Sequence, residues 1–254
     1  MGINSAFKST CKTLLGGEIG ELREYEKYLQ KYVEPVKKTK SAISGKDVYF
    51  THNYADGTRF ISNDEMGEYA KIIAKAKLDV NEIKDIDSIV SAIGEKVYYS
   101  GNILLGKSSD ANVANRLVDS SVINKSHDVF YSKFVSHSYL VKYAEYVFGS
   151  VSIGKGMNSC IKCFETYDDS RVFECLRVYQ SSGCTYSANL EHCQDCMYSF
   201  NLRSKRNCIG NLQLEKSEYL GLKEKLLEGI RDELEKKKDI VSIIEIVAKG
   251  KING

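Results

Sequence analysis

The sequence has one proline and no tryptophan, and it lacks the long apolar runs that mark secreted and membrane proteins. Its first residues, MGINSAFKSTCKTLLGG, contain no apolar stretch of the kind found in secretory signals, so we expect a cytoplasmic, reducing setting. The most apolar late stretch, Ile240 to Ala248, is far shorter than the roughly 20 residues that cross a bilayer. The sequence therefore predicts a soluble protein with no membrane partner, located in the cytoplasm or, if viral, in the virion.

A strong charge of either sign is also missing. The 36 Lys and Arg residues nearly balance the 34 Asp and Glu residues, and the net charge of +2 gives no general attraction to nucleic acid or acidic lipid. Phosphate-binding motifs are absent as well, because Gly16-Gly17 lacks the rest of a P-loop. With 254 residues, 43% hydrophobic and 28% charged, the chain is neither disordered nor collagen-like and can form one large or two modest domains.

Residues 1–95 combine helical and strand patterns and predict an N-terminal α+β unit. Hydrophobic residues at three- and four-residue spacing indicate three helices. These helices are expected at residues 19–33 before Pro35, at 66–76 behind an Asn63 or Asp64 cap, and at 83–93 between Asn81 and Gly94. Two β-prone runs flank Asp56-Gly57, and this arrangement predicts a β-hairpin within residues 47–62.

The residue pattern changes after residue 95. Short apolar runs alternate with polar residues and, further along, form a regular 12-residue repeat. From Asn158 the repeats are NSCIKCFETYDD, SRVFECLRVYQS, SGCTYSANLEHC, QDCMYSFNLRSK and RNCIGNLQLE. We call each position within the repeat a column. The sixth column is small and polar or a thiol, and the seventh and ninth are apolar around a polar eighth. The third column holds Cys160, Val172, Cys184, Cys196 and Cys208.

Self-similarity at a short period is typical of a solenoid, in which each coil buries its apolar residues against its neighbours. The apolar seventh and ninth columns indicate strands with one buried face. We therefore predict a parallel β-solenoid at residues 96–214, most regular from residue 158, with looser repeats that can begin near Val97. A coil can contain one repeat or two. We favour 24-residue coils, since Cys160, Cys184 and Cys208 then stack and a 12-residue coil leaves little interior.

Residues 215–254 return to helical spacing and predict a C-terminal helical segment. Leu222, Leu226 and Ile230 fall on one face of a first helix, and Asp239 can cap a second one. The open end of a solenoid exposes edge strands that pair with other chains unless they are covered. We therefore expect these helices either to cap the solenoid or to dock on a protein partner, including another copy of the chain.

The clustered cysteines allow three interpretations. Zinc ligands are one, because Cys160 and Cys163, and again Cys193 and Cys196, have the Cys-x-x-Cys spacing, with His192 as a substitute ligand. However, the two pairs are further apart in the sequence than is usual for such sites. All clustered cysteines except Cys193 also occupy the third and sixth columns, which favours reduced packing thiols. Disulfide rungs across the coil are the third interpretation. We favour packing thiols and no cofactor, with zinc as the alternative.

The last repeat and the residues after it, SKRNCIGNLQLEKSEYLGLKEKL, resemble the closing unit of proteins with Cys-, Ser- and Asn-rich short repeats. In those proteins the last repeat leads into a charged helix with a Lys-Glu-Tyr-like element, which corresponds here to Lys216-Ser217-Glu218-Tyr219. The resemblance is confined to the C-terminal half and implies a β-solenoid with no assigned activity. The repeat length is also similar to that of insect antifreeze solenoids, but their regular Thr-x-Thr surface is missing, so ice binding is not implied.

These observations favour a non-enzymatic β-solenoid that serves in assembly or protein binding, as a subunit of a viral or cellular assembly. No catalytic residue is assigned, because only His192 lies near the cysteines and its spacing matches no Cys-His signature. The alternative is a zinc-binding module that contacts nucleic acid through its cysteines and the basic turn from Arg203 to Asn207. Nucleic acid is not favoured, because a short charged run is usually a solvated turn.

Overall fold

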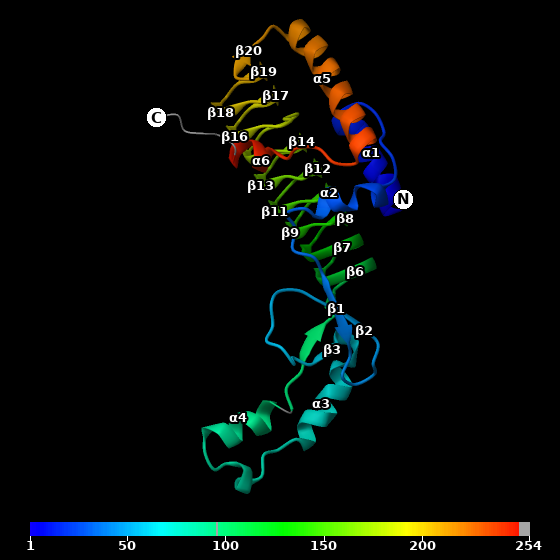
Figure 1. The fold of residues 1–254 in the computed structure, drawn as a ribbon, viewed down its shortest axis with the longest axis vertical. Coiled ribbons are helices and arrows are strands. Elements are labelled where there is room, and N and C mark those ends of the chain that lie inside the picture. The colour runs from blue at the N-terminus through cyan, green and yellow to red at the C-terminus, as the bar shows by residue number, and fades with distance from the viewer. Residues whose placement is uncertain (95, 249–254) are drawn as a thin grey trace.

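A parallel β-solenoid forms the centre of the computed structural model, which describes residues 1–94 and 96–248 (Figure 1). Its strands pair with residues one repeat away, for example Lys133 with Glu145 and Leu190 with Leu202. One coil is therefore a single repeat. The predicted solenoid is confirmed, and the preference for 24-residue coils is wrong.

The strands of the solenoid form two rows of parallel strands along the coil, and the long strand β7 joins the rows by pairing with both β8 and β9. They are β5 (Leu104–Leu105), β6 (Ser109–Val118), β7 (Ser121–Phe130), β8 (Lys133–Ser136), β9 (Tyr139–Lys142), β10 (Glu145–Phe148), β11 (Val151–Gly154), β12 (Asn158–Ile161), β13 (Phe164–Tyr167), β14 (Ser170–Phe173), β15 (Leu176–Tyr179), β16 (Ala188–Glu191), β17 (Gln194–Met197), β18 (Phe200–Arg203), β19 (Arg206–Ile209) and β20 (Leu212–Gln213). Only β20 runs antiparallel to its neighbour among these described strands, and it closes the ladder on β19.

The coil closes within a single repeat because the backbone turns at every third residue. In the coil that starts at Asn158, the residues with a left-handed φ are Ser159, Lys162, Glu165 and Asp168. The next residue after each of them is at most 1% exposed: Cys160, Cys163, Thr166 and Asp169. Inward side chains thus recur every three residues, and not every two as in a flat strand. Four of them fill the narrow interior of each coil.

Serines inside the coil accept hydrogen bonds from the next coil, which explains the small polar residues of the sixth and twelfth columns. The Ser199 N–H donates to Ser187 Oγ at 3.2 Å, and the Cys193 N–H donates to Ser181 Oγ at 2.9 Å. A buried N–H without an acceptor would cost about 1–3 kcal/mol. Cys163 occupies the same column as Ser187, and its thiol donates to the carbonyl of Ile161 at 3.5 Å.

The seventh and ninth columns face two different cores. The ninth column points into the coil, where Val178 and Leu190 are fully buried. The seventh column points outward, where Ala188 belongs to a second cluster against which Leu176 and Phe200 pack. The prediction of a single buried strand face is therefore wrong. Both columns are apolar because the chain termini cover the outside of the solenoid.

The covering segments come from both ends of the chain and lie side by side along the solenoid (Figure 1). They are α1 (Ile3–Leu15), the 3₁₀ turn Leu22–Tyr25, α2 (Glu26–Gln30), α5 (Lys216–Lys237) and α6 (Ile243–Ala248). The two C-terminal helices are confirmed, and residues 249–254 of the predicted segment lie outside the described residues. The predicted helix at 19–33 is shorter than expected, and α1 was not predicted.

The predicted α+β content of the N-terminal residues is also confirmed, but the strands pair differently from the prediction. Strand β1 (Lys37–Lys40) pairs antiparallel with β2 (Asp47–Phe50), and β3 (Phe60–Ser62) pairs parallel with β4 (Tyr99–Gly101). The predicted hairpin around Asp56-Gly57 is therefore wrong, because β2 and β3 each take another partner. Strand β4 belongs to this unit, so the first pairing in the solenoid joins Leu104 to Leu117.

Two helices connect β3 to β4, as the hydrophobic spacing predicted. They are α3 (Met66–Lys75) and α4 (Ile86–Gly94), preceded by the 3₁₀ turns Asn63–Glu65 and Val80–Glu82. The first cap differs from the prediction. Ser62 and Glu65 form a capping box, in which each side chain bonds the backbone N–H of the other residue, so neither Asn63 nor Asp64 is the cap.

Candidate interaction site

The structure does not bring the four candidate zinc ligands together. Cys160 and Cys196 occupy the same column three coils apart, which separates them by about 14 Å at the spacing of neighbouring strands. Zinc–sulfur bonds are about 2.3 Å long. His192 points outward with 54% of its side chain exposed. In residues 1–94 and 96–248, no group of three or more His, Cys, Asp or Glu could hold a metal ion.

The cysteines lie inside the protein as packing residues. All eight are buried and unbridged. Burial raises the pKa of the Cys163 and Cys175 thiols well above its usual value. Cys196 differs, because a hydrogen bond from Cys184 lowers its pKa to about 7. This thiol nevertheless has no exposed surface, since Cys184 and Cys208 occupy the same column in the coils on either side.

The C-terminal helices bury part of their apolar side chains within the chain. Leu227, Ile230 and Leu234 of α5 are buried against the outer cluster, and so is Ile243 of α6. Leu220 and Leu222 of α5 remain 50% and 42% exposed, so docking of these helices on a protein partner stays a prediction. The basic turn after β18 is exposed, and Arg203 forms an ion pair with Glu191 at 2.8 Å on the neighbouring coil.

A buried charge cluster ties both termini to the fifth column of the solenoid. Glu174 accepts hydrogen bonds from the Tyr28 hydroxyl at 2.6 Å, from the Ser242 hydroxyl at 2.8 Å and from the Ile243 N–H at 3.0 Å. Lys162 Nζ lies 3.4 Å from Glu174 and 4.1 Å from the Tyr28 ring centre. Burial raises the pKa of Glu174 and lowers that of Lys162. The cluster is completed by residues of this chain and has a structural role.

One histidine at the start of the solenoid, His127, is also held by residues of this chain. His127 Nδ1 lies 2.9 Å from Asp128 and Nε2 lies 3.2 Å from the carbonyl oxygen of Glu34. The imidazole also stacks on Tyr139, and Asp128 pairs with Arg116 at 3.0 Å. Both ring nitrogens of His127 are therefore occupied, and the cluster fixes the N-terminal segment to the first coils.

The helical connection between β3 and β4 is different from every other part of the described chain. We call residues 66–94 the arm. The arm extends away from the solenoid (Figure 1), and no described residue from Met66 to Tyr99 is buried. Its large apolar side chains are open to solvent, including Ile86 at 77%, Val90 at 64% and Ile93 at 45% exposure. These three lie on one face of α4, at positions i, i+4 and i+7.

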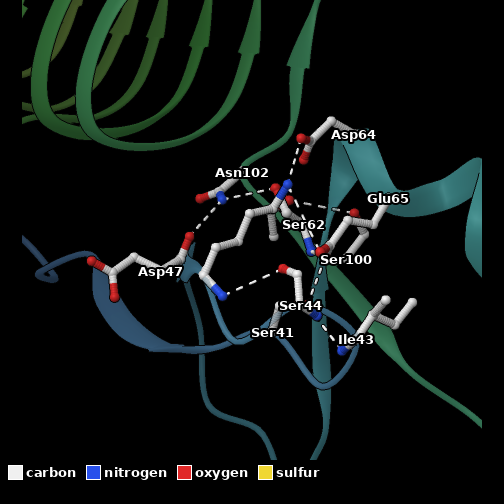
Figure 2. Close-up of polar contacts among 11 residues, drawn as sticks. Ser41, Ile43, Ser44, Asp47, Ser62, Asp64, Glu65, Ser100 and Asn102 are labelled. Atoms are coloured by element: carbon white, nitrogen blue, oxygen red, sulfur yellow. Dashed lines mark hydrogen bonds and ion pairs between the residues drawn. The ribbon is translucent and has the colours of Figure 1, made fainter.

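The base of the arm is fixed by a buried carboxylate (Figure 2). Glu65 accepts hydrogen bonds from the Ser41 hydroxyl at 2.6 Å and from the Ser62 N–H at 2.7 Å. Lys46 Nζ lies 3.8 Å from the other carboxylate oxygen and also pairs with Asp64. Burial alone would raise the pKa of Glu65, but these hydrogen bonds and the nearby ammonium group lower it. The carboxylate thus remains charged and holds the start of the arm.

Asn102 connects this base to the beginning of the solenoid (Figure 2). Its carboxamide donates to the Asp47 carbonyl at 3.0 Å and to the Ser62 hydroxyl at 2.9 Å, and it accepts from the Tyr49 N–H at 2.8 Å. An open cavity of about 410 Å³ lies beside it, and its lining includes Lys46, Tyr49, Leu104 and Ala111. The Lys46 ammonium is already paired with Asp64 and Glu65.

The far end of the arm returns through a second anchor. Arg59 lies 4.6 Å from the ring centre of Tyr98 and donates to the Gly94 carbonyl at 2.7 Å. The rings of Tyr69 and Tyr98 are 5.3 Å apart. Both ends of the arm are therefore fixed to the protein, while no apolar residue between the anchors is buried by the part of the chain that the structure describes.

The sequence located these helices but not their exposure. Ile86, Val90 and Ile93 have the spacing of an ordinary core-facing helix. Such a pattern shows that a helix has an apolar face and not which molecule covers it. No protein-family model matches the chain, and no curated protein matches it significantly. No helix in the described residues is long and apolar enough to cross a membrane.

Proposed function

We propose that this protein is a non-enzymatic binding subunit of a larger assembly, in which the solenoid is a rigid spine and the arm docks on another protein. The observation that carries this proposal is the absence of any buried residue among the described residues from Met66 to Tyr99. Contiguous exposed apolar surface of this kind is typical of protein interaction sites.

The connection between β3 and β4 makes the exposure unusual. A crossover between parallel strands normally packs its helix back on the sheet that it connects. Here α3 and α4 extend away from β3 and β4 instead, and they make hardly any contact with each other. Helices this short are marginal in water without tertiary packing. Their apolar faces are thus available for another molecule, which would supply the missing core.

The rest of the molecule supports a spine rather than an enzyme. Glu174 and Lys162 form a buried ion pair at 3.4 Å, and Glu174 also accepts hydrogen bonds from both terminal segments. The stacked coils share a continuous hydrogen-bond ladder, which gives a stiff support for the arm.

Shortening the arm tests this proposal. A chain in which residues 67–97 are replaced by about six Gly and Ser residues, spanning about 20 Å when extended, can still connect β3 to β4. We expect its melting temperature to stay close to that of the parent, because the free energy of unfolding should change by less than about 1 kcal/mol when no buried side chain is lost. Its binding of a dye for exposed apolar surface should fall.

A truncation after Lys238 provides the control. It removes Ile243, which is fully buried, and the Ser242 hydroxyl that bonds Glu174. We expect this truncation to lower the melting temperature clearly. If the arm-shortened chain loses as much stability as the truncated chain, the arm belongs to the core of the protein and the proposed function is wrong.

A further inference from the structure

Opposite charges are separated along the arm. The lysines of α3 and of the two residues after it are Lys71, Lys75 and Lys77. The aspartates before and within the first turn of α4 are Asp79, Asp85 and Asp87. Glu68 and Lys84 are the described charges of opposite sign in each half. All of these residues are exposed, and none of the three lysines pairs with Asp85 or Asp87 in the part of the chain that the structure describes.

We infer that the arm binds the arm of a second copy of this chain. This inference rests on the proposed function and names its partner. In a two-fold dimer, α3 of one copy packs antiparallel on α4 of the other, and the reverse contact follows from symmetry. The basic end of α3 then lies beside the acidic start of α4 in both contacts, while a parallel pairing of α3 with α3 or of α4 with α4 would bring like charges together.

The apolar residues support the same arrangement. Ile72 and Ile73 of α3 are 43% and 41% exposed, and the face of α4 carries Ile86, Val90 and Ile93. Two copies would enclose these side chains between four helices, with the charged residues around the rim, as in typical interfaces. The arm spans residues 66–94, and a standard interface takes about 20–30 residues from each partner. The arm is therefore large enough to form the whole interface.

A charge-swapped pair tests the specific contact between α3 and α4. The first variant carries Lys71→Glu, Lys75→Glu and Lys77→Glu. The second carries Asp87→Lys and Ser91→Lys, and it retains Asp85, whose carboxylate caps α4 by accepting from the Ser88 N–H at 2.8 Å. Light scattering after size exclusion should give the parent twice the mass of one 28.6 kDa chain. Each variant alone should dissociate at least about tenfold more readily than the parent.

The mixture of the two variants is the decisive sample. In the mixed dimer, the acidic α3 of the first variant meets the basic α4 of the second. The unchanged basic α3 of the second variant meets the unchanged acidic α4 of the first, so opposite charges face each other in both contacts. We therefore expect the mixture to recover the dimeric mass. A third variant, Ile86→Ser with Val90→Ser, should remain monomeric alone and in either mixture. Circular dichroism checks that every variant retains the solenoid.

The outcomes separate this inference from the proposed function. A parent that stays monomeric at high concentration overturns the inference, and so does a mixture that stays monomeric while the parent dimerises. Charge variants that dimerise as well as the parent also overturn it. If the arm-shortened chain nevertheless keeps the parent melting temperature, the arm remains a docking element for a different protein and the proposed function stands.

Discussion

Val172 lies in the interior of the coil. Its side chain is fully buried in the third column, between Cys160 and the coil that contains Cys184. Val172→Asp would place an unpaired carboxylate in this interior, where no water can solvate it. We expect the free energy of unfolding to fall by roughly 3 kcal/mol or more, measured by urea denaturation.

The adjacent residue provides a matched control. Arg171 is exposed and has a left-handed φ of +52°, which aspartate tolerates well. Arg171→Asp should therefore change the free energy of unfolding by less than about 0.5 kcal/mol. Equal stability losses for the two variants would show that the third column does not point into the coil.

At the scale of residues, the sequence revealed the repeat but not the path of the backbone. Repetition was visible because each coil places the same column in the same environment. The turns were not, because left-handed positions usually favour glycine, whereas here they carry residues such as Lys162 and Glu165. Without these turns, 12 residues appear too few to enclose an interior. The sequence therefore favoured a 24-residue coil, in which Cys160 and Cys184 would stack in neighbouring coils.

At the scale of elements, the chain termini are held to the solenoid by a few buried contacts. Glu174 alone bonds α2 through Tyr28 and α6 through Ser242 and the Ile243 N–H. Glu174→Leu would leave the Lys162 ammonium buried without a counter-charge. We expect this variant to lose about 3–5 kcal/mol of unfolding free energy in urea denaturation.

A second substitution separates the charge from the packing. Adding Lys162→Met removes the unpaired ammonium, so the double variant should recover much of the stability that Glu174→Leu loses. An exposed pair on the same solenoid serves as the reference. Arg177 pairs with Glu165 at 3.0 Å, and Glu165→Leu should cost less than about 1 kcal/mol. A double variant no more stable than Glu174→Leu would show that Lys162 is not the source of the cost.

The sequence predicted most helices but fewer of the strand pairings. Helix α1 could have been predicted, because Phe7, Cys11 and Leu14 follow helical spacing and are buried. The pairing of β2 with β1 was harder to predict, because local patterns show where strands lie and not which strands meet. Asp56-Gly57 does form a turn, but the strands before and after it do not pair with each other as a hairpin.

At the scale of the whole molecule, the protein combines a solenoid spine whose apolar residues are largely buried with an arm whose apolar residues are exposed. Two cores, one inside the coils and one beneath the terminal helices, bury the apolar residues of the spine. Neither core includes a residue of the arm. This division could not be predicted from the sequence, because an amphipathic helix has the same pattern whether its own chain or another protein covers it.

Amide hydrogen exchange, followed by mass spectrometry in dilute and concentrated solution, tests this division most directly. Amides in cooperative, well-packed elements exchange slowly, whereas helices without tertiary contacts open readily. We predict that residues 66–94 exchange rapidly in dilute solution and slow down as the protein is concentrated, while the coil strands remain protected throughout. Arm amides that are as protected as the coil strands at the highest dilution would contradict the account, because the arm would then be stabilised by its own chain.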